Sequence, residues 1–484
     1  MSFKSRFPLG AALVLMPLAC TLAYPLGGYD DGAQAAADAG LDANAIEDGG
    51  EAAPPDGDAA ATENDPDPSP MLAYASGAAI RYRRWNAATS SWSAPADGPA
   101  IASGRDVRGV ALKRSTVNGR RTLAVYTVAG GVSDAELAVY DWIGGSFREA
   151  FRARDFGARP EWRTFDLACD GKSGNTYVVY SNATTGSPRL RSRDDRGWTE
   201  ERGAFADSIG ETLTFTELVT RPGTDDMTLL YVDGSRHFAA ARLAGNGFEP
   251  PARLAGTISV TEHKAFAGAY ESKSGDLFVT WAAEGTFNWN TVPPGAAAIP
   301  PAMSEPHPDV SQTGVMAVAA DPSSDRIALA LLESVCGMKD CDDWSLDMWN
   351  GAGLDGLATL DGDITQSYAG LEANAPIAVG WAGGQAVAVY FRDADGFRWG
   401  RWRDGKWVLQ PPFVPRDPIG PKASFVTFRS GSDLVLLIEE LSGKLWAKRF
   451  DGTSWSDTEG AGPLAEGLPN PDDFNGITFA IDAP

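Results

Sequence analysis

The stretch KLWAKRFDGTSW at residues 444–455 is one copy of a pattern that recurs along the chain. It starts as a short strand, turns at Asp451-Gly452 and ends on the large apolar side chain of Trp455. Asp-Gly between two apolar stretches is a strong hairpin signal, because both residues tolerate the backbone of a tight turn. The other clear copies end on Trp92, Phe147, Phe248 and Trp407. A hairpin that returns at regular spacing predicts a repeat architecture.

An apolar strand before each hairpin sets the length of the repeat. Its landmark positions are Tyr74, Tyr126, Tyr180, Tyr231, Trp281, Leu331, Tyr390 and Ile438. Their average spacing of 52 residues gives room for eight units between residues 71 and 484. Each unit also holds a strand before the landmark strand, and turns such as RPGTDD at 221–226 join the two. With the two strands of the hairpin, every unit is predicted to contain four strands.

The order of strands at the two ends of this region predicts a closed ring. Met71 begins a landmark strand that has no first strand before it, whereas Gly476–Ile481 has the pattern of a first strand with no landmark strand after it. Pairing the two strands would complete one four-stranded unit, as in the closure of a β-propeller. We therefore predict an all-β, eight-bladed β-propeller over residues 71–484. Seven blades are the alternative, because the unit at 264–301 is the least regular.

The first 70 residues predict export and membrane attachment. Residues 1–20 join a charged start to an apolar run that is too short to span a bilayer, as in a secretory signal peptide. Leu18-Ala19-Cys20 resembles the lipobox of bacterial lipoproteins, which implies that Cys20 is acylated and becomes the mature N-terminus. Cleavage after Ala23 is the alternative. Residues 21–70, with 12 acidic and no basic side chains, are predicted to form a disordered linker.

These segments define the expected location. We expect a lipoprotein of the cell envelope, in the outer membrane, whose only contact with the membrane is the lipid on Cys20. With cleavage after Ala23, the protein would instead be secreted or periplasmic.

Composition and charge restrict the partners. The 484 residues include 54 Gly, 32 Pro and 48 Trp, Tyr and Phe, which is typical of turn-rich β structure. A net charge of −23 argues against a nucleic-acid partner, because nucleic-acid binding requires a basic footprint. Residues 71–205 nevertheless carry a net charge of +6, and residues 206–484 carry −19. The basic surface of residues 71–205 would bind an anionic partner such as an acidic glycan. The alternative is a solvated surface on which the aliphatic parts of the Arg side chains pack against aromatic rings.

The third strand and hairpin resemble the repeat of fucose-binding propeller lectins and, more loosely, sialidase-type propellers. The resemblance rests on the pattern apolar-x-apolar-x-x-Trp-x-Gly-x-x-Trp, which LWAKRFDGTSW at 445–455 follows with Phe450 in place of the first Trp. In the lectins a Glu of this strand and an Arg of a neighbouring strand hold the sugar. The positions that match this Glu are not acidic: Tyr82, Val139, Leu190, Ala240, Leu346, Trp399 and Ala447. The resemblance therefore implies the blade and not the lectin site.

Candidate ligand-binding residues lie in the loops before the first strand and after the landmark strand, which share one face of a propeller. Variable loops on a rigid scaffold usually carry function. The acidic residues at these positions are Asp233, Glu284, Glu333, Asp393, Glu439 and Glu440. They favour a cation or a polyhydroxylated ligand. The alternative is that these carboxylates only keep an exposed face soluble.

The remaining chemistry-bearing residues predict no catalytic or metal centre. The chain has three histidines and no nucleophile-elbow motif, so we expect no catalytic residue, no metal and no cofactor. Cys336 and Cys341 flank a long insertion, and in an exported protein this pair predicts a disulfide that pins the loop. Two free thiols are the alternative.

The sequence thus favours an exported, lipid-anchored binding or scaffold propeller at the cell surface, with a glycan or another cell-surface polymer as its partner. A secreted carbohydrate-active hydrolase of sialidase-like architecture is the alternative, so enzymatic activity stays open. A purely structural envelope protein is the third possibility.

Overall fold

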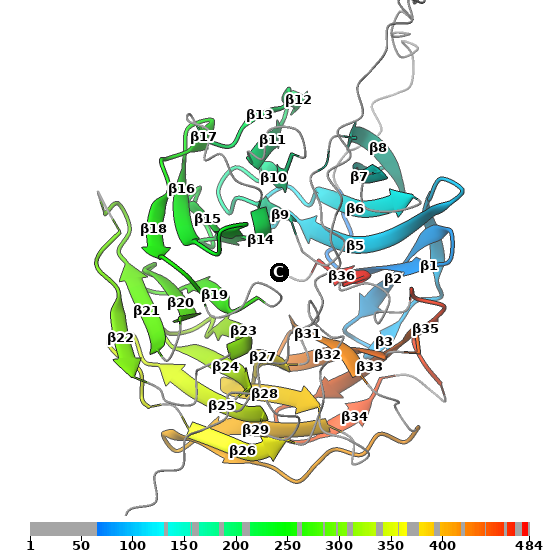
Figure 1. Ribbon diagram of the computed structural model, residues 1–484. Helices are drawn as coiled ribbons and strands as arrows, with labels where there is room; N and C mark the ends of the chain where they lie inside the picture. The colour runs from blue at the N-terminus through cyan, green and yellow to red at the C-terminus, as the bar shows by residue number, and fades with distance from the viewer. Residues whose placement is uncertain are drawn as a thin grey trace, which may run out of the picture. The chain divides into compact units, whose positions relative to one another are not determined.

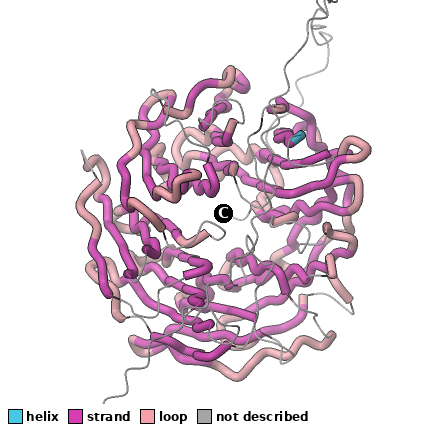
Figure 2. Tube along the Cα trace, viewed as in Figure 1, coloured by secondary structure: helices cyan, strands magenta, loops and turns pink. Residues whose placement is uncertain are grey.

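The computed structural model describes residues 65–482 with internal gaps. The gaps are 130–133, 155, 157–163, 183–187, 206–212, 259–263, 284–285, 297–298, 307–312, 335–341, 357, 365–376, 392–396, 418–421, 441, 459–461 and 470–476. The chain divides into two units, Met1–Asp58 and Ala59–Pro484, and all described residues belong to the second. Strands form nearly all of its regular secondary structure (Figure 2), and the described part contains no α-helix, only a short 3₁₀ segment at Asp134.

Eight antiparallel sheets follow one another around a ring (Figure 1). Blade 1 contains β1 (Met71–Ser76), β2 (Ala79–Asn86), β3 (Ser91–Trp92), β4 (Ala96–Ala100) and the C-terminal β36 (Phe479–Ile481). Blade 2 contains β5 (Arg105–Arg114), β6 (Arg121–Ala129), β7 (Ala135–Ile143) and β8 (Ser146–Ala153). Blade 3 contains β9 (Phe165–Cys169), β10 (Thr176–Ser181), β11 (Pro188–Asp194), β12 (Gly197–Trp198) and β13 (Arg202–Gly203). Blade 4 contains β14 (Leu213–Thr220), β15 (Met227–Asp233), β16 (Phe238–Ala244), β17 (Gly247–Phe248) and β18 (Ala252–Ala255).

The second half of the ring repeats this order. Blade 5 contains β19 (Phe266–Tyr270), β20 (Leu277–Ala283), β21 (Thr286–Val292) and β22 (Met303–Pro306). Blade 6 contains β23 (Thr313–Ala320), β24 (Ile327–Ser334), β25 (Asp342–Trp349) and β26 (Ala358–Ile364). Blade 7 contains β27 (Ile377–Ala382), β28 (Gln385–Phe391), β29 (Phe397–Arg403) and β30 (Lys406–Leu409). Blade 8 contains β31 (Lys422–Ser430), β32 (Asp433–Glu440), β33 (Lys444–Phe450), β34 (Trp455–Asp457) and β35 (Ala465–Glu466).

The ring closes by pairing the two ends of the domain. Strand β36 runs antiparallel to β1, with Leu72 opposite Ile481 and Tyr74 opposite Phe479. The chain is an eight-bladed β-propeller. The seven-blade alternative is wrong, because the irregular unit at 264–301 supplies the first three strands of blade 5 and β22 completes the sheet. The closing strand is shorter than the predicted Gly476–Ile481, since it begins at Phe479.

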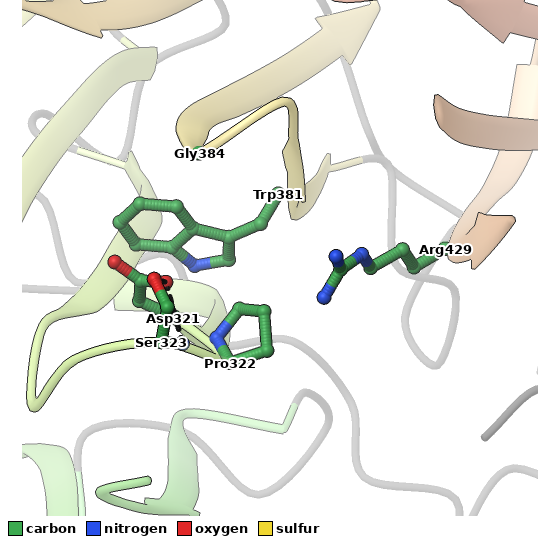
Figure 3. A pocket seen from close by; sticks show the side chains of 6 residues that line it. All are labelled: Asp321, Pro322, Ser323, Trp381, Gly384 and Arg429. Atoms are coloured by element: carbon green, nitrogen blue, oxygen red, sulfur yellow. Dashed lines mark hydrogen bonds between the residues drawn. The ribbon is translucent and has the colours of Figure 1, made fainter. Parts of the chain in front are cut away.

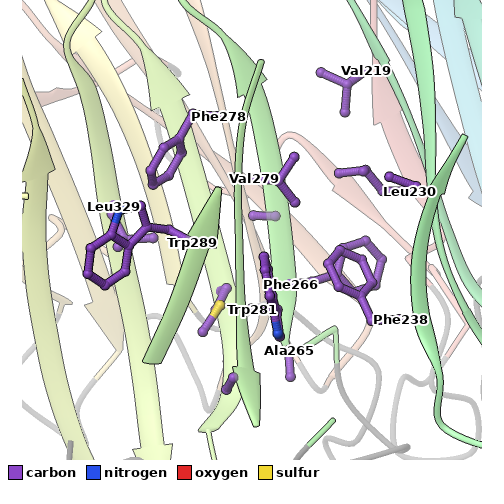
Figure 4. Close-up of a cluster of buried hydrophobic side chains, with 14 of the residues drawn as sticks. Val219, Leu230, Phe238, Ala265, Phe266, Phe278, Val279, Trp281, Trp289 and Leu329 are labelled. Carbon is purple, nitrogen blue, oxygen red and sulfur yellow. The ribbon is translucent and has the colours of Figure 1, made fainter. Parts of the chain in front are cut away.

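The hydrophobic core lies between adjacent blades rather than in one central cluster. Each blade is covered on both faces by its neighbours, so its middle strands are apolar at successive positions, as in Leu229–Val232. In Figure 4, Phe238 of blade 4 packs beside Phe266 and Trp281 of blade 5, with ring centroids 4.9 and 5.5 Å apart. Similar clusters continue around the ring, and one of them joins Phe428 of blade 8 to Trp85 of blade 1.

The turns between the first and second strands of the blades, here called the A–B turns, contact one another from blade to blade. The Gly171 amide of blade 3 donates to the Thr224 carbonyl of blade 4 at 2.7 Å. The Asp325 carboxylate of blade 6 accepts from the Lys273 amide of blade 5 at 2.7 Å. The Gly383 amide of blade 7 donates to the Ser432 carbonyl of blade 8 at 2.8 Å. These contacts join turns of neighbouring blades into rigid pairs on one face of the ring.

The segment just before β1 is part of the propeller. The Arg121 guanidinium at the start of β6 is fully buried, and it binds the carboxylates of Asp65 and Asp482. It also donates to the Asp67 carbonyl at 3.1 Å. The ordered domain therefore includes residues 65–70, which the sequence assigned to the linker. One buried cation joins this segment, blade 2 and the end of the closing strand.

Several predicted features lie outside the described residues. They are the signal peptide at 1–20 with Cys20, the linker up to residue 64, and the pair Cys336 and Cys341. Cys169 on β9 is a free thiol, and burial raises its pKa to about 11. No helix in the part of the chain that the structure describes is long and apolar enough to cross a membrane.

Candidate functional site

The acidic residues predicted to bind a ligand are distributed around the ring. Asp233 ends β15 in blade 4, whereas Glu439 and Glu440 end β32 in blade 8. Glu333 belongs to β24 in blade 6, and Glu284 and Asp393 fall in the gaps of the described chain. Of the predicted residues that the structure describes, Glu439 and Glu440 are brought together, as neighbours on one strand. Their ligand-binding role stays a prediction.

Asp233 and Glu440 are buried and organise local structure. Asp233 accepts hydrogen bonds from the Ser235 and His237 amides at 2.9 and 2.8 Å, and its second oxygen lies 3.0 Å from His237 Nδ1. Glu440 accepts a hydrogen bond from Trp446 Nε1 at 2.7 Å, within its own blade. Both residues are buried, and the hydrogen bonds of their carboxylates hold the turn after the second strand.

Glu439 is buried at the closure of the ring. Its side chain is fully enclosed, and its Oε1 accepts a hydrogen bond at 2.8 Å from the Thr478 hydroxyl, just before β36. Burial raises the pKa of Glu439 to about 7, although hydrogen bonds from Thr478 and Ser424 oppose the shift. The residue links blade 8 to the closing segment.

A pocket of about 150 Å³ lies on the opposite face, among the A–B turns of blades 6, 7 and 8 (Figure 3). Its lining comes from three consecutive blades and consists of Asp321, Pro322, Ser323, Trp381, Gly384 and Arg429. This volume corresponds to about five water molecules, so the pocket suits one small ring or a single unit of a polymer.

The Asp321 turn forms one wall of the pocket. Its Oδ1 accepts from the Ser323 amide at 2.9 Å and the Ser323 hydroxyl at 2.8 Å. Its Oδ2 accepts from the Ser324 hydroxyl at 2.6 Å and from Arg326 Nη2 at 2.7 Å. Burial alone would raise the pKa of Asp321, but these donors outweigh burial and hold it below its ordinary value. The carboxylate is thus a fixed, ionised part of the scaffold.

An aromatic ring and a proline supply the apolar part of the pocket. Trp381 at the end of β27 donates from Nε1 to the Ala319 carbonyl at 2.8 Å, which fixes its ring against blade 6. The Arg326 guanidinium lies 5.0 Å from the Trp381 ring centroid. Beside this ring, Gly383 and Gly384 have φ of 55° and 79°, as a two-residue hairpin turn requires, and no side chain narrows the entrance there.

Arg429 forms the rim of the pocket. It is exposed at the end of β31, and its Nε donates to the Gly431 carbonyl at 2.8 Å. In Figure 3 its guanidinium points toward Pro322, across the opening from Trp381. The pocket therefore combines an apolar floor, a fixed carboxylate and an exposed cation. Among the described residues, no three His, Cys, Asp or Glu side chains are grouped so that they could hold a metal ion.

Similarity to known proteins is found among solved structures and is distant. No protein-family model and no curated protein sequence matches the chain. Among solved structures, the SapL1 lectin in complex with alpha methyl fucoside matches with a TM-score of 0.36 and 10% identity, over 64% of this chain and 98% of that one. The six-bladed fungal lectin of Aleuria aurantia matches with a TM-score of 0.32 and 9% identity, over 65% and 98%. A puromycin-hydrolyzing peptidase of Mycobacterium tuberculosis matches with a TM-score of 0.41 and 14% identity, over 75% and 53%. Likeness at this level implies no shared ligand or reaction.

The sequence predicted the elements of the pocket but not the pocket itself. DPSSD at 321–325 and SGSD at 430–433 stand between a first strand and a landmark strand, as RPGTDD at 221–226 does. Predicted blade order would also have placed Trp381 and Arg429 at the ends of neighbouring first strands. The signal that could have found the site is this shared register: an aromatic residue and an arginine at the same end of adjacent first strands.

Proposed function

We propose that the protein is a carbohydrate-binding propeller that is exported and held at the cell surface by a lipid on Cys20. The observation that supports the binding role is the pocket among Pro322, Trp381 and Arg429, which places an apolar surface beside an exposed hydrogen-bond donor. Export and anchoring rest on the sequence of residues 1–20.

This combination suits a saccharide for a physical reason. A sugar ring has apolar C–H faces and polar edges, so it binds where an apolar surface adjoins directed hydrogen-bond donors. The pocket has room for about one ring, and a longer glycan would extend from it across the exposed A–B turns. The rigid contacts between these turns keep the site open without a ligand, so that binding loses little conformational entropy.

A hydrolase of sialidase-like architecture would need two carboxylates about 5–10 Å apart in a site that substrate can reach. Glu439 has the raised pKa of a general acid, but its side chain is fully enclosed. Asp321 lines the pocket, but its low pKa and four hydrogen bonds make it a poor proton donor. We therefore propose binding without hydrolysis as the function.

The test is a glycan screen of the purified full chain, followed by titration calorimetry of each glycan that binds. We expect binding of at least one saccharide class with no change in the saccharide after prolonged incubation. A loss of affinity in Pro322→Asp would place the site at this pocket, because the added charge removes the apolar surface. Absence of binding to every glycan would refute the proposal, and release of shorter sugars would favour the hydrolase.

A further inference from the structure

We infer that the pocket selects an anionic saccharide unit, one that carries a carboxylate such as a hexuronate, through the Arg429 guanidinium. This inference rests on the proposed carbohydrate-binding function and specifies its ligand class. It follows from which polar groups of the pocket already form hydrogen bonds or ion pairs within the protein, and which can still bind a ligand.

The Asp321 carboxylate has no capacity left for a ligand hydroxyl. Each of its oxygens already accepts two hydrogen bonds, from Ser323 on one side and from Ser324 and Arg326 on the other. A carboxylate oxygen accepts about two such bonds. A neutral sugar, which needs acceptors for its hydroxyl protons, would thus gain nothing from Asp321.

The charges around the pocket leave one uncompensated cation. Arg326 neutralises Asp321 at 2.7 Å, so this pair contributes no net charge. The Asp433 carboxylate, four residues after Arg429, is bound to Arg449 at 2.6 Å. Among the residues that line the pocket, this leaves Arg429 as the cation without a carboxylate partner. An anionic ligand completes the charge balance of the site.

The geometry of Arg429 also favours a carboxylate. Its Nε is held by the Gly431 carbonyl at 2.8 Å, which limits the rotation of the guanidinium. The two terminal nitrogens lie at the other edge, and Figure 3 shows that end directed toward Pro322 and the opening. A carboxylate can accept from both nitrogens in a parallel, bidentate arrangement while the sugar ring packs against the exposed Pro322.

The experiment compares matched ligands that differ only in charge. Oligogalacturonate and oligomannuronate are titrated into the full chain beside their methyl esters, which keep the ring and lose the carboxylate charge. At 0.15 M salt, where the Debye length is about 8 Å, repulsion from the rest of this acidic chain is screened while contact pairs persist. We expect at least one acid form to bind about tenfold or more tightly than its ester, because a charge-assisted hydrogen bond is lost in the ester.

Variants assign this preference to one side chain. Arg429→Gln should bind acid and ester equally, and Arg429→Lys should keep part of the preference because it retains the charge without the bidentate geometry. The matched control is Arg253→Gln, since Arg253 is also exposed and its Nε also donates to the carbonyl two residues later. This control should leave the preference unchanged, and melting curves verify that all three variants are folded.

The outcomes separate this inference from the proposed function. Equal affinity for acid and ester, or a preference that survives in Arg429→Gln, overturns the inference. If neutral glycans from the screen bind at the pocket and the uronates do not, the carbohydrate-binding function stands and the anionic selectivity is wrong. If no saccharide of either kind binds, both are refuted.

Discussion

Substituting Glu439 should change how the stability of the ring depends on pH. The residue is fully enclosed between blade 8 and the closing segment, where the Thr478 hydroxyl donates to its Oε1 at 2.8 Å. Glu439→Gln keeps the shape and the acceptor for Thr478 but cannot ionise. It therefore isolates the cost of placing a negative charge at the closure.

The size and sign of the effect follow from the pKa. Burial raises the pKa of Glu439 from 4.5 to about 7, so the folded protein favours the protonated acid. The stabilisation from the protonated form is complete below pH 4.5 and is lost as the pH rises through 7. At 1.36 kcal/mol per pH unit, the loss is about 3 kcal/mol. For a domain of roughly 400 residues this amounts to about 4 °C in melting temperature, at ~2.1 cal/mol/K per residue.

The assay is the melting temperature of wild type and Glu439→Gln at a series of pH values from 4 to 8.5. We expect the two proteins to melt alike near pH 4.5, and the variant to be more stable by about 4 °C above pH 7.5. Other carboxylates titrate in both proteins, so the difference between the curves reports Glu439 alone. A difference that is independent of pH, or a variant that is less stable at pH 8, would show that the buried group is not a titrating acid.

Three further substitutions test other parts of the account. Arg121→Met leaves the Asp65 and Asp482 carboxylates buried without their cation. We expect the free energy of unfolding, measured by denaturant titration, to fall by about 3–5 kcal/mol. A loss under 1 kcal/mol would contradict the role of Arg121 at the closure. Gly171→Ala would bring a Cβ to 2.4 Å from the Gly223 amide nitrogen, so we expect the free energy of unfolding to fall by about 1–3 kcal/mol. In the control Gly353→Ala the added Cβ meets open space, and this variant should unfold like the wild type. Cys20→Ser should move the protein from the membrane to the soluble fraction, and a mature N-terminus at Tyr24 in the unsubstituted protein would instead show cleavage after Ala23.

Most of the fold could be predicted because every blade repeats the same local signals. The landmark residues Tyr74 and Ile438 both lie on second strands, and the predicted turn at 221–226 separates β14 from β15. The closure could be predicted because the C-terminal end of the domain carries the first strand that the N-terminal unit lacks. The exact start of β36 could not, since three residues suffice to pair with β1 and the sequence before them is compatible with either strand or loop.

The site was less predictable because it depends on contacts between blades. Spacing places Asp233 and Glu439 at the ends of second strands, but it does not show that the first accepts bonds from its own turn and the second is enclosed by Thr478. The pocket is assembled from Asp321, Trp381 and Arg429, which are about one repeat apart and meet only in the closed ring. Periodicity gives the position of each residue in its blade, and packing decides which of them are left for a ligand.

The closed ring is the central claim, because the pairing of the first and last strands defines the eight-bladed propeller. The most direct measurement is a disulfide between Ala73→Cys and Ala480→Cys, which lie opposite each other on β1 and β36. Residues paired across antiparallel strands have Cα atoms about 4.5–5.5 Å apart, within the range that a disulfide spans. We predict that mild oxidation of the folded double variant yields a peptide linking residues 73 and 480 in a non-reduced mass-spectrometric map. Free thiols at both positions in the folded protein, under conditions in which a small disulfide reagent labels them, would contradict the closure.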